Sequence, residues 1–201
     1  FLEGEADVLV GTQMVAKGLD LPAVTLVGVI SADIGLHIPD FRSAERTFQL
    51  LTQVAGRAGR ATNDSGPPPG RVVIQTYTPE SYAIVAAAQH DYAAFFETEI
   101  ELRRLEGYPP FVRLARLIYT DPNPERAERQ AAAMVRSLRE DIARRGLPGA
   151  YVIDAAPPHI PKWHGRYRWQ VTVRSPDPTE LLGPLTLPEG WTLEIDPVSL
   201  A

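Results

Sequence analysis

The sequence contains no cysteine, so neither a disulfide nor a thiolate metal site can form within these 201 residues. Its four histidines are scattered, and we expect no metal site from them either. No apolar run is long enough to span a bilayer, and no basic and apolar leader opens the sequence. Lysine is scarce, with two against 18 arginines, in a chain whose net charge is −5. Any nucleic-acid contact must therefore be a local patch.

Composition otherwise describes an ordinary globular chain of one or two domains. Hydrophobic residues make up 44% and charged residues 22% of the sequence, which suffices for a sizeable core. The sequence opens on Phe1 without methionine and soon reaches the apolar run Val8-Leu9-Val10. We therefore expect a piece of a longer protein.

A glutamine and two arginines recur at helical spacing. Gln53, Arg57 and Arg60 stand at i, i+4 and i+7, within about 60° of one another on a helix of 3.6 residues per turn. Two converging guanidinium groups repel each other unless an anion lies between them, and their planar donors suit phosphate oxygens. The intervening Gly56 and Gly59 each cost a helix about 1 kcal/mol relative to alanine, which favours a close backbone approach. The stretch predicts a phosphate clamp; the alternative is a solvated, arginine-rich helix end.

The first half of the chain alternates strand and helix patterns, as a parallel α/β sheet does. Residues 7–12 predict a short buried strand that ends in a Gly-Thr turn. Residues 24–30 form a β-branched run that predicts a strand covered on both faces. The other expected elements are a helix from Ser43 that buries Phe48, Leu51 and Val54, a strand at 71–76, and one long helix from Glu80 to Glu106.

The second half has the element order β-α-β-β-α-β of a ferredoxin-like module. The turn Tyr108-Pro109-Pro110 separates it from the first half, so we place one domain at 1–107, long helix included, and an α+β domain at 108–201. The helix at 124–145 carries acids at pairing distance from its arginines, which favours a solvated face. The other expected elements are strands at 111–119, 151–155, 167–174 and 191–196, and a short helix at 178–185.

A second polar stretch follows the first expected strand. Thr12 at a strand end is suited to contact a nucleic-acid phosphate through its hydroxyl and N–H groups, and Asp20 is suited to accept a ribose hydroxyl. Both residue types also satisfy ordinary turns, so this stretch alone is weak evidence. It becomes strong evidence for a nucleotide or nucleic-acid site only in combination with the Gln53–Arg60 stretch further along the chain.

These stretches resemble motifs V and VI of superfamily 2 helicases. Motif V is matched by Gly11-Thr12-Gln13-Met14 and Lys17-Gly18-Leu19-Asp20-Leu21-Pro22, and motif VI by Gln53 to Arg60. The intervening stretch from Asp40 to Leu51 narrows the resemblance to the replication-restart helicases of that superfamily. Residues 108–111 and 165–170 are similar to landmarks of that family's C-terminal domain, so the resemblance covers essentially the whole chain.

The resemblance implies a fold and a nucleotide site. In such helicases ATP lies between two RecA-like lobes, so residues 1–107 would hold the end of the second, parallel-sheet lobe. Arg60 would be the arginine finger with Arg57 beside it on the phosphates, both stabilising charge that develops in phosphoryl transfer. The other implied contacts are Gln53 with the nucleotide or its attacking water, Gly18 and Asp20 with the nucleotide, Lys17 with either ligand, and Thr12 and Gln13 with DNA.

The sequence lacks the other half of that site. A P-loop needs Gly-Lys-Ser or Gly-Lys-Thr, whereas Lys17 precedes glycine and Lys162 precedes tryptophan. ATP and Mg²⁺ would be bound together with a first lobe outside this sequence, and the chain alone is expected to be inactive. The resemblance implies zinc in the parent protein. It implies no metal in this chain, because the family's zinc-binding cysteines lie N-terminal to motif V and are absent here.

The activity implied for the parent is ATP-dependent, 3′–5′ DNA unwinding that recognises stalled or branched forks and restarts replication by primosome assembly. The alternative is a non-catalytic DNA- and protein-binding scaffold for replication restart. The implied partners are branched and single-stranded DNA and primosome proteins. The resemblance also implies a place in the bacterial cytoplasm, at the nucleoid.

A basic and aromatic stretch near residue 165 forms a second candidate site. Strand alternation puts its polar members on one face and its aromatic members on the other. Such residues can stack bases and neutralise phosphates, but large aromatic side chains are usually buried, and we favour a core role for the aromatic members. The polar members are Arg166, Arg168 and Gln170, and the aromatic members are Tyr167 and Trp169.

The family resemblance assigns this stretch two partners. It implies that Arg166 and Gln170 bind the acidic C-terminal tail of single-stranded DNA-binding protein, with a guanidinium group on a carboxylate. It also implies DNA contact by the same domain, which we assign to Arg168.

Overall fold

The computed structural model describes residues 5–12, 24–56 and 70–200, and the chain forms two compact units. Unit 1 comprises Phe1–Ile38 and Arg42–Glu99, and unit 2 comprises Pro39–Phe41 and Ile100–Ala201. The short segment Pro39–Phe41 belongs to unit 2 because the ring of Phe41 stacks on that of Tyr108, with centroids 5.4 Å apart. The predicted domain boundary at residues 108–110 stays a prediction.

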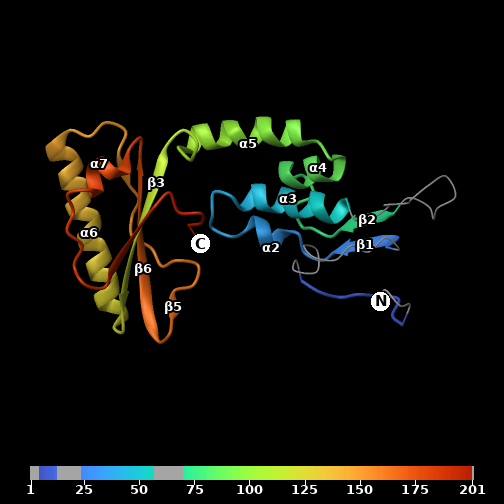
Figure 1. Cartoon of the computed structure of the whole chain (residues 1–201), viewed down its shortest axis with the longest axis horizontal. Coiled ribbons are helices and arrows are strands. Elements are labelled where there is room, and N and C mark those ends of the chain that lie inside the picture. The colour runs from blue at the N-terminus through green and yellow to red at the C-terminus, as the bar shows by residue number, and fades with distance from the viewer. Residues whose placement is uncertain (1–4, 13–23, 57–69, 201) are drawn as a thin grey trace. The chain divides into compact units, whose positions relative to one another are not determined.

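The strands of unit 1 form a parallel pair, as predicted. Strand β1, Leu26–Val29, pairs with β2, Arg71–Ile74 (Figure 1). Val29 and Ile74 pack against the helices, whereas Leu26 is 61% exposed. The prediction that β1 is covered on both faces is therefore wrong, because the described helices of unit 1 bury only one of its faces.

The predicted strand at 7–12 is not formed. Residues 5–12 have no regular secondary structure, and Val8 and Val10 are 75% and 85% exposed. A buried parallel strand needs a neighbouring strand to satisfy its backbone groups, and among the described strands β1 and β2 pair only with each other. The apolar run predicts a buried strand, but the pairing that would bury it is lacking in the described part of the chain.

The helices of unit 1 bury one apolar face. Helix α2, Asp33–Leu36, is followed by α3, Ser43–Ala55, whose Phe48, Leu51 and Val54 are 5%, 1% and 7% exposed. This confirms the predicted buried face of α3. Phe48 stacks on Phe95 with ring centroids 4.3 Å apart.

The long helix predicted from Glu80 to Glu106 is two helices. Helix α4, Tyr82–Gln89, ends at His90, whose φ of 54° is left-handed, and α5, Tyr92–Glu106, follows. A left-handed residue cannot continue an α-helix. The Asp91 carboxylate then accepts a hydrogen bond from the backbone N–H of Ala94 at 2.9 Å, which supports the new helix start.

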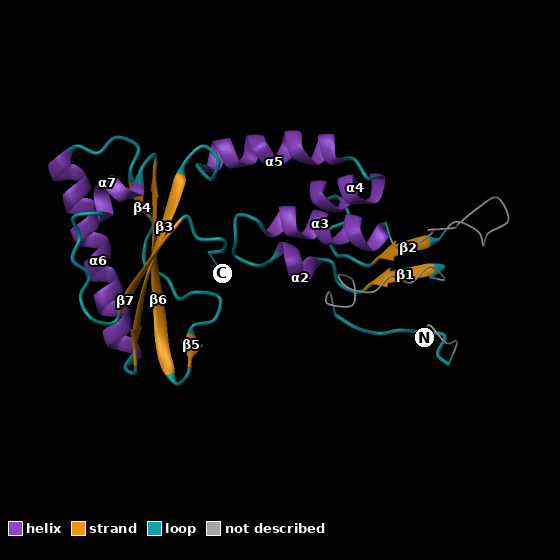
Figure 2. Ribbon diagram, viewed as in Figure 1, coloured by secondary structure: helices purple, strands orange, loops and turns teal. Residues whose placement is uncertain are grey.

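After the last turns of α5, unit 2 consists of an antiparallel sheet and two helices, in the predicted ferredoxin-like order (Figure 2). The strands lie in the order β4-β6-β3-β7, and the additional strand β5 pairs with β6 as a hairpin. None of the helices in the described ranges is long and apolar enough to cross a membrane. The elements are β3 Arg113–Asp121, α6 Pro124–Arg145, β4 Tyr151–Val152, β5 Lys162–Trp163, β6 Arg166–Ser175, α7 Pro178–Leu182 and β7 Trp191–Ile195.

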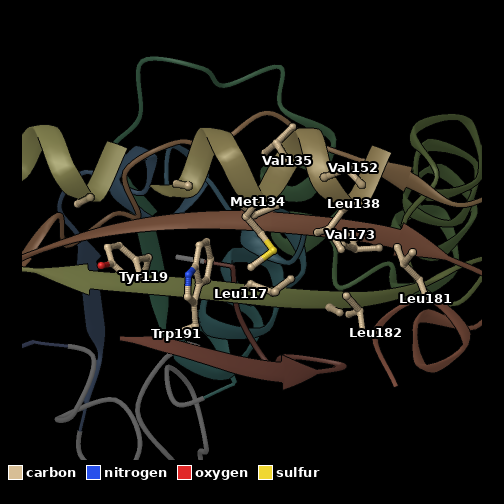
Figure 3. Close-up of a cluster of buried hydrophobic side chains, with 14 residues drawn as sticks. Leu117, Tyr119, Met134, Val135, Leu138, Val152, Val173, Leu181, Leu182 and Trp191 are labelled. Carbon is tan, nitrogen blue, oxygen red and sulfur yellow. The ribbon is translucent and has the colours of Figure 1, made fainter. Parts of the chain in front are cut away.

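The core of unit 2 lies between α6 and the sheet. Met134 and Leu138 of α6 meet Leu117 of β3 and Val173 of β6, as Figure 3 shows. The opposite face of α6 carries exposed arginines, among them Arg129 in an i, i+4 pair with Glu125, so the predicted solvated face is confirmed. The helices pack on one face of the sheet, and we call the opposite face the helix-free face.

Candidate functional site

The described end of the motif VI helix presents Gln53 to solvent. Leu51 and Val54 anchor the last turns of α3 in the core, and Gln53 points away from them, with no hydrogen-bond partner for its side chain among the described residues. Helix α3 ends at Ala55, and the N–H of Gly56 caps it on the Thr52 carbonyl oxygen at 2.9 Å. The core thus fixes the direction of α3 up to its end at Ala55.

Most of the predicted nucleotide and DNA contacts lie outside the described residues. Thr12 is described, and it is exposed in a segment without regular structure. Its predicted contact with DNA, and the convergence of the arginines on Gln53, stay predictions. The predicted site residues outside the described ranges are Gln13, Lys17, Gly18, Asp20, Arg57 and Arg60.

An aspartate that the sequence did not single out joins the carboxyl ends of the two parallel strands. The Asp33 side chain, 5% exposed, accepts hydrogen bonds from the hydroxyls of Thr76 and Thr78 at 2.8 and 2.9 Å. The N–H of Tyr77 donates to the same carboxylate at 3.1 Å. Asp33 thus ties together the two segments that leave the carboxyl ends of β1 and β2, the edge of an α/β sheet where functional loops usually lie.

The charge of Asp33 is stabilised by these donors. Burial opposes ionisation and by itself raises the pKa of Asp33, but the hydrogen bonds from Thr76, Thr78 and the Tyr77 N–H outweigh it and hold that pKa below its ordinary value. A carboxylate whose pKa is lower in the folded than in the unfolded chain stabilises the fold when ionised. This contribution is complete above the unfolded pKa of about 3.9 and is lost as pH falls through the lower, folded pKa.

Replacing Asp33 with asparagine should therefore lower the melting temperature of unit 1 at neutral pH and much less in acid. Circular dichroism follows both units, whereas tryptophan fluorescence follows unit 2 alone, because all three tryptophans lie there. Glu97→Gln is the matched control, since Glu97 is an exposed carboxylate of the same unit without a described partner. An Asp33→Asn effect that does not shrink below about pH 3.9 would contradict the assignment.

Strand β6 separates core residues from a polar row, as predicted. Tyr167 and Trp169 pack against the α6 core, which confirms the core interpretation of both aromatic residues. Arg166, Arg168 and Gln170 therefore alternate onto the helix-free face. Neither arginine forms an ion pair with a described carboxylate, so both are available to an anionic ligand.

Gln170 already has a partner within the chain. Its Nε2 donates to the carbonyl oxygen of Leu200 at 3.2 Å, and the N–H of Leu200 donates to the Asp40 carboxylate at 3.1 Å. Ser199 donates its hydroxyl to the same carboxylate. Residues 199–200 thus lie over part of the helix-free face. This contact joins distant segments of the chain, and no local feature of the sequence predicts it.

Known families match both units. Residues 1–62 match the family described as helicase conserved C-terminal domain, and residues 104–198 match primosomal protein N C-terminal domain. The parallel α/β pair with its motif helix is consistent with the first match, and the ferredoxin-like sheet with the second. The chain therefore joins the end of a helicase conserved C-terminal domain to a primosomal protein N C-terminal domain.

Curated relatives sharpen this class. The chain is 47% identical over 181 residues to the replication restart protein PriA of Bacillus subtilis, covering 90% of this chain and 21% of the relative. It is 43% identical over 185 residues to that of Synechocystis, covering 92% and 21%. The chain belongs to the PriA family of replication restart proteins, and it spans about a fifth of the length of these relatives.

Proposed function

We propose that this chain supplies the arginine-finger half of the ATP site in a DNA helicase that restarts replication at stalled or branched forks. The observation that carries the proposal is the end of α3, where a buried face fixes the helix and Gln53 stands exposed just before the motif VI arginines. An arginine finger must be held rigidly from outside the lobe that binds the phosphates. A helix anchored by Leu51 and Val54 meets that need.

The division of labour follows from charge. Arg60 would stabilise the charge that develops on the γ-phosphate, and Arg57 would neutralise the neighbouring phosphate oxygens. Gln53, an amide with both donor and acceptor, suits the attacking water. Mg²⁺ and the P-loop would come with the other lobe. The remaining nucleotide contacts in this proposal are Gly18, Asp20 and Lys17.

The test is the substitution Arg60→Ala in a complete helicase core. It should abolish DNA-stimulated ATP hydrolysis and leave DNA binding intact. A core that hydrolyses no ATP even with Arg60 present would favour the non-catalytic scaffold instead.

DNA would meet both units. Thr12 and Gln13 would contact the backbone from unit 1, where hydroxyl and N–H groups position nucleic acid without reading its sequence. Arg168, half-buried beside Thr120 on the helix-free face, would neutralise a phosphate. The 3′–5′ direction of unwinding belongs to this proposal and is supported by the family resemblance alone.

The helix-free face would also bind an acidic peptide, the C-terminal tail of single-stranded DNA-binding protein. Arg166 is exposed and without a described ion pair, which suits a carboxylate. Gln170 lies on the same face of β6, four residues after Arg166. Its Oε1 has no hydrogen-bond partner among the described residues. A bound tail would compete with Leu200 for the Gln170 amide.

Arg166→Glu should weaken binding of an acidic peptide by at least tenfold, because it removes a charge-assisted hydrogen bond and adds repulsion. Isothermal titration of the 201-residue chain measures this. Arg136→Glu is the matched control, since Arg136 is an exposed arginine of α6 on the other side of the sheet. Equal affinities for the two variants would argue against the site.

A further inference from the structure

The β5–β6 hairpin exposes a tryptophan. Trp163 is 55% exposed, whereas the other two tryptophans, Trp169 and Trp191, pack in the core of unit 2. Tryptophan is highly buried on average, so an exposed indole on an ordered strand points to a ligand. The pairing Trp163↔Arg166 places it on the same face as Arg166, because paired residues of antiparallel strands share a face.

The hairpin holds this indole in place. His164 and Gly165 form the two-residue turn with φ values of 47° and 78°, the left-handed pair that a tight hairpin turn requires. The rings of His164 and Trp163 form a T-shaped contact with their centroids 4.9 Å apart. Below the turn, the N–H of Arg168 donates to the Pro161 carbonyl oxygen at 2.9 Å. The indole of Trp163, 55% exposed, is therefore held at the end of a supported hairpin.

The segment of sequence that forms the hairpin carries charge of one sign. Residues 155–176 contain no aspartate or glutamate and four lysines or arginines, within a chain of net charge −5. Lys162 lies over the Tyr167 ring at 4.7 Å, on the face opposite Trp163. Arg166 and Arg168 remain without a described ion pair beside the indole. An anionic ligand with flat, apolar groups fits both features at once.

We propose that Trp163 is a stacking platform for a base of single-stranded DNA, with Arg166 on the adjoining phosphate. Every base has a π-face, and stacking on an aromatic side chain needs no pocket, which suits the tip of a hairpin. An apolar peptide residue would need a concave site instead. This inference rests on the proposed DNA binding by unit 2. It assigns to Trp163 the preference of that binding for unpaired strands.

The test compares two oligomers on the 201-residue chain. One is a labelled oligothymidylate of about 12 nucleotides, and the other is an abasic oligomer of equal length, which keeps the phosphates and lacks the bases. Trp163→Ala should weaken oligothymidylate binding by roughly 5- to 150-fold and leave abasic binding unchanged. Trp163→Phe should restore most of the affinity, because it restores a ring.

Tyr151→Ala is the matched control. Tyr151 is 59% exposed in the same unit, on β4, which pairs with the far end of β6 at Arg174 and Val173. Its removal should change neither affinity. In a second readout, oligothymidylate should quench tryptophan fluorescence in the unsubstituted chain and not in Trp163→Phe.

Each other outcome has a definite meaning. If the unsubstituted chain binds both oligomers equally, or if Trp163→Ala leaves oligothymidylate binding unchanged, stacking on Trp163 is wrong, whereas DNA binding by the chain stands. If the chain binds neither oligomer, the proposed DNA binding fails together with the inference. If Trp163→Ala weakens only an acidic peptide, the hairpin is a protein site and the inference is overturned.

Discussion

Replacing Arg60 with alanine should reduce DNA-stimulated ATP hydrolysis by about 10³- to 10⁵-fold, the range that arginine fingers contribute to phosphoryl transfer. The assay needs both lobes of the site. We would use a chimera in which this chain replaces the matching 181 residues of the Bacillus subtilis relative. The loss should fall on the rate of hydrolysis, because the guanidinium group acts on charge that develops only in the transition state.

Two further variants separate the finger from general charge loss. Arg60→Lys keeps the charge but loses the planar pair of donors, so it should recover only a small part of the rate. Arg71→Ala removes an exposed arginine of β2 in the same unit and should leave the rate unchanged. Filter binding should show unaltered DNA affinity for Arg60→Ala. Hydrolysis retained by Arg60→Ala would contradict the assignment.

Leu117→Ala should be among the most destabilising substitutions in unit 2. Leu117 lies on the central strand β3, is 0% exposed, and contacts the α6 core. Truncating such a leucine removes buried apolar surface and leaves a cavity, at a cost of roughly 3 to 5 kcal/mol. Urea unfolding followed by tryptophan fluorescence reports this unit alone, since all three tryptophans lie in it.

Leu105→Ala is the control of equal chemistry. Leu105 belongs to the same unit but is 79% exposed, so the same truncation should change the free energy of unfolding by no more than about 0.5 kcal/mol. Similar losses in the two variants would mean that the core of unit 2 does not lie between α6 and the sheet.

Local signals explain which elements could be predicted. Helix α6 has an apolar stripe, and Asn123 caps it by accepting from the N–H of Arg126 at 2.9 Å, so pattern and cap agree. The sequence does not predict the break at His90, because a left-handed histidine carries no strong local signal. Residues 7–12 predict a buried strand because they contain a continuous apolar run, but such a run does not report whether a partner strand is present.

The candidate sites divide in the same way. Motif VI and the basic, aromatic stretch are each a continuous run of sequence, so their chemistry can be predicted from residue type and spacing. Asp33 meets Thr76 and Thr78 across more than forty residues of sequence, and Asp40 meets Ser199 and Leu200 across about 160. Such pairings follow from how the chain packs.

The sequence by itself determined the family, the ferredoxin-like element order, the buried face of α3 and the alternation of β6, because each depends on neighbours within a few residues. Only the tertiary structure decided that Trp163 is exposed beside Arg166 and that the Gln170 amide donates to the Leu200 carbonyl oxygen. It also decided that Asp33 ties two strand ends together. Those facts depend on strand pairing and on contacts between distant segments, and such contacts form only when the whole unit buries its core.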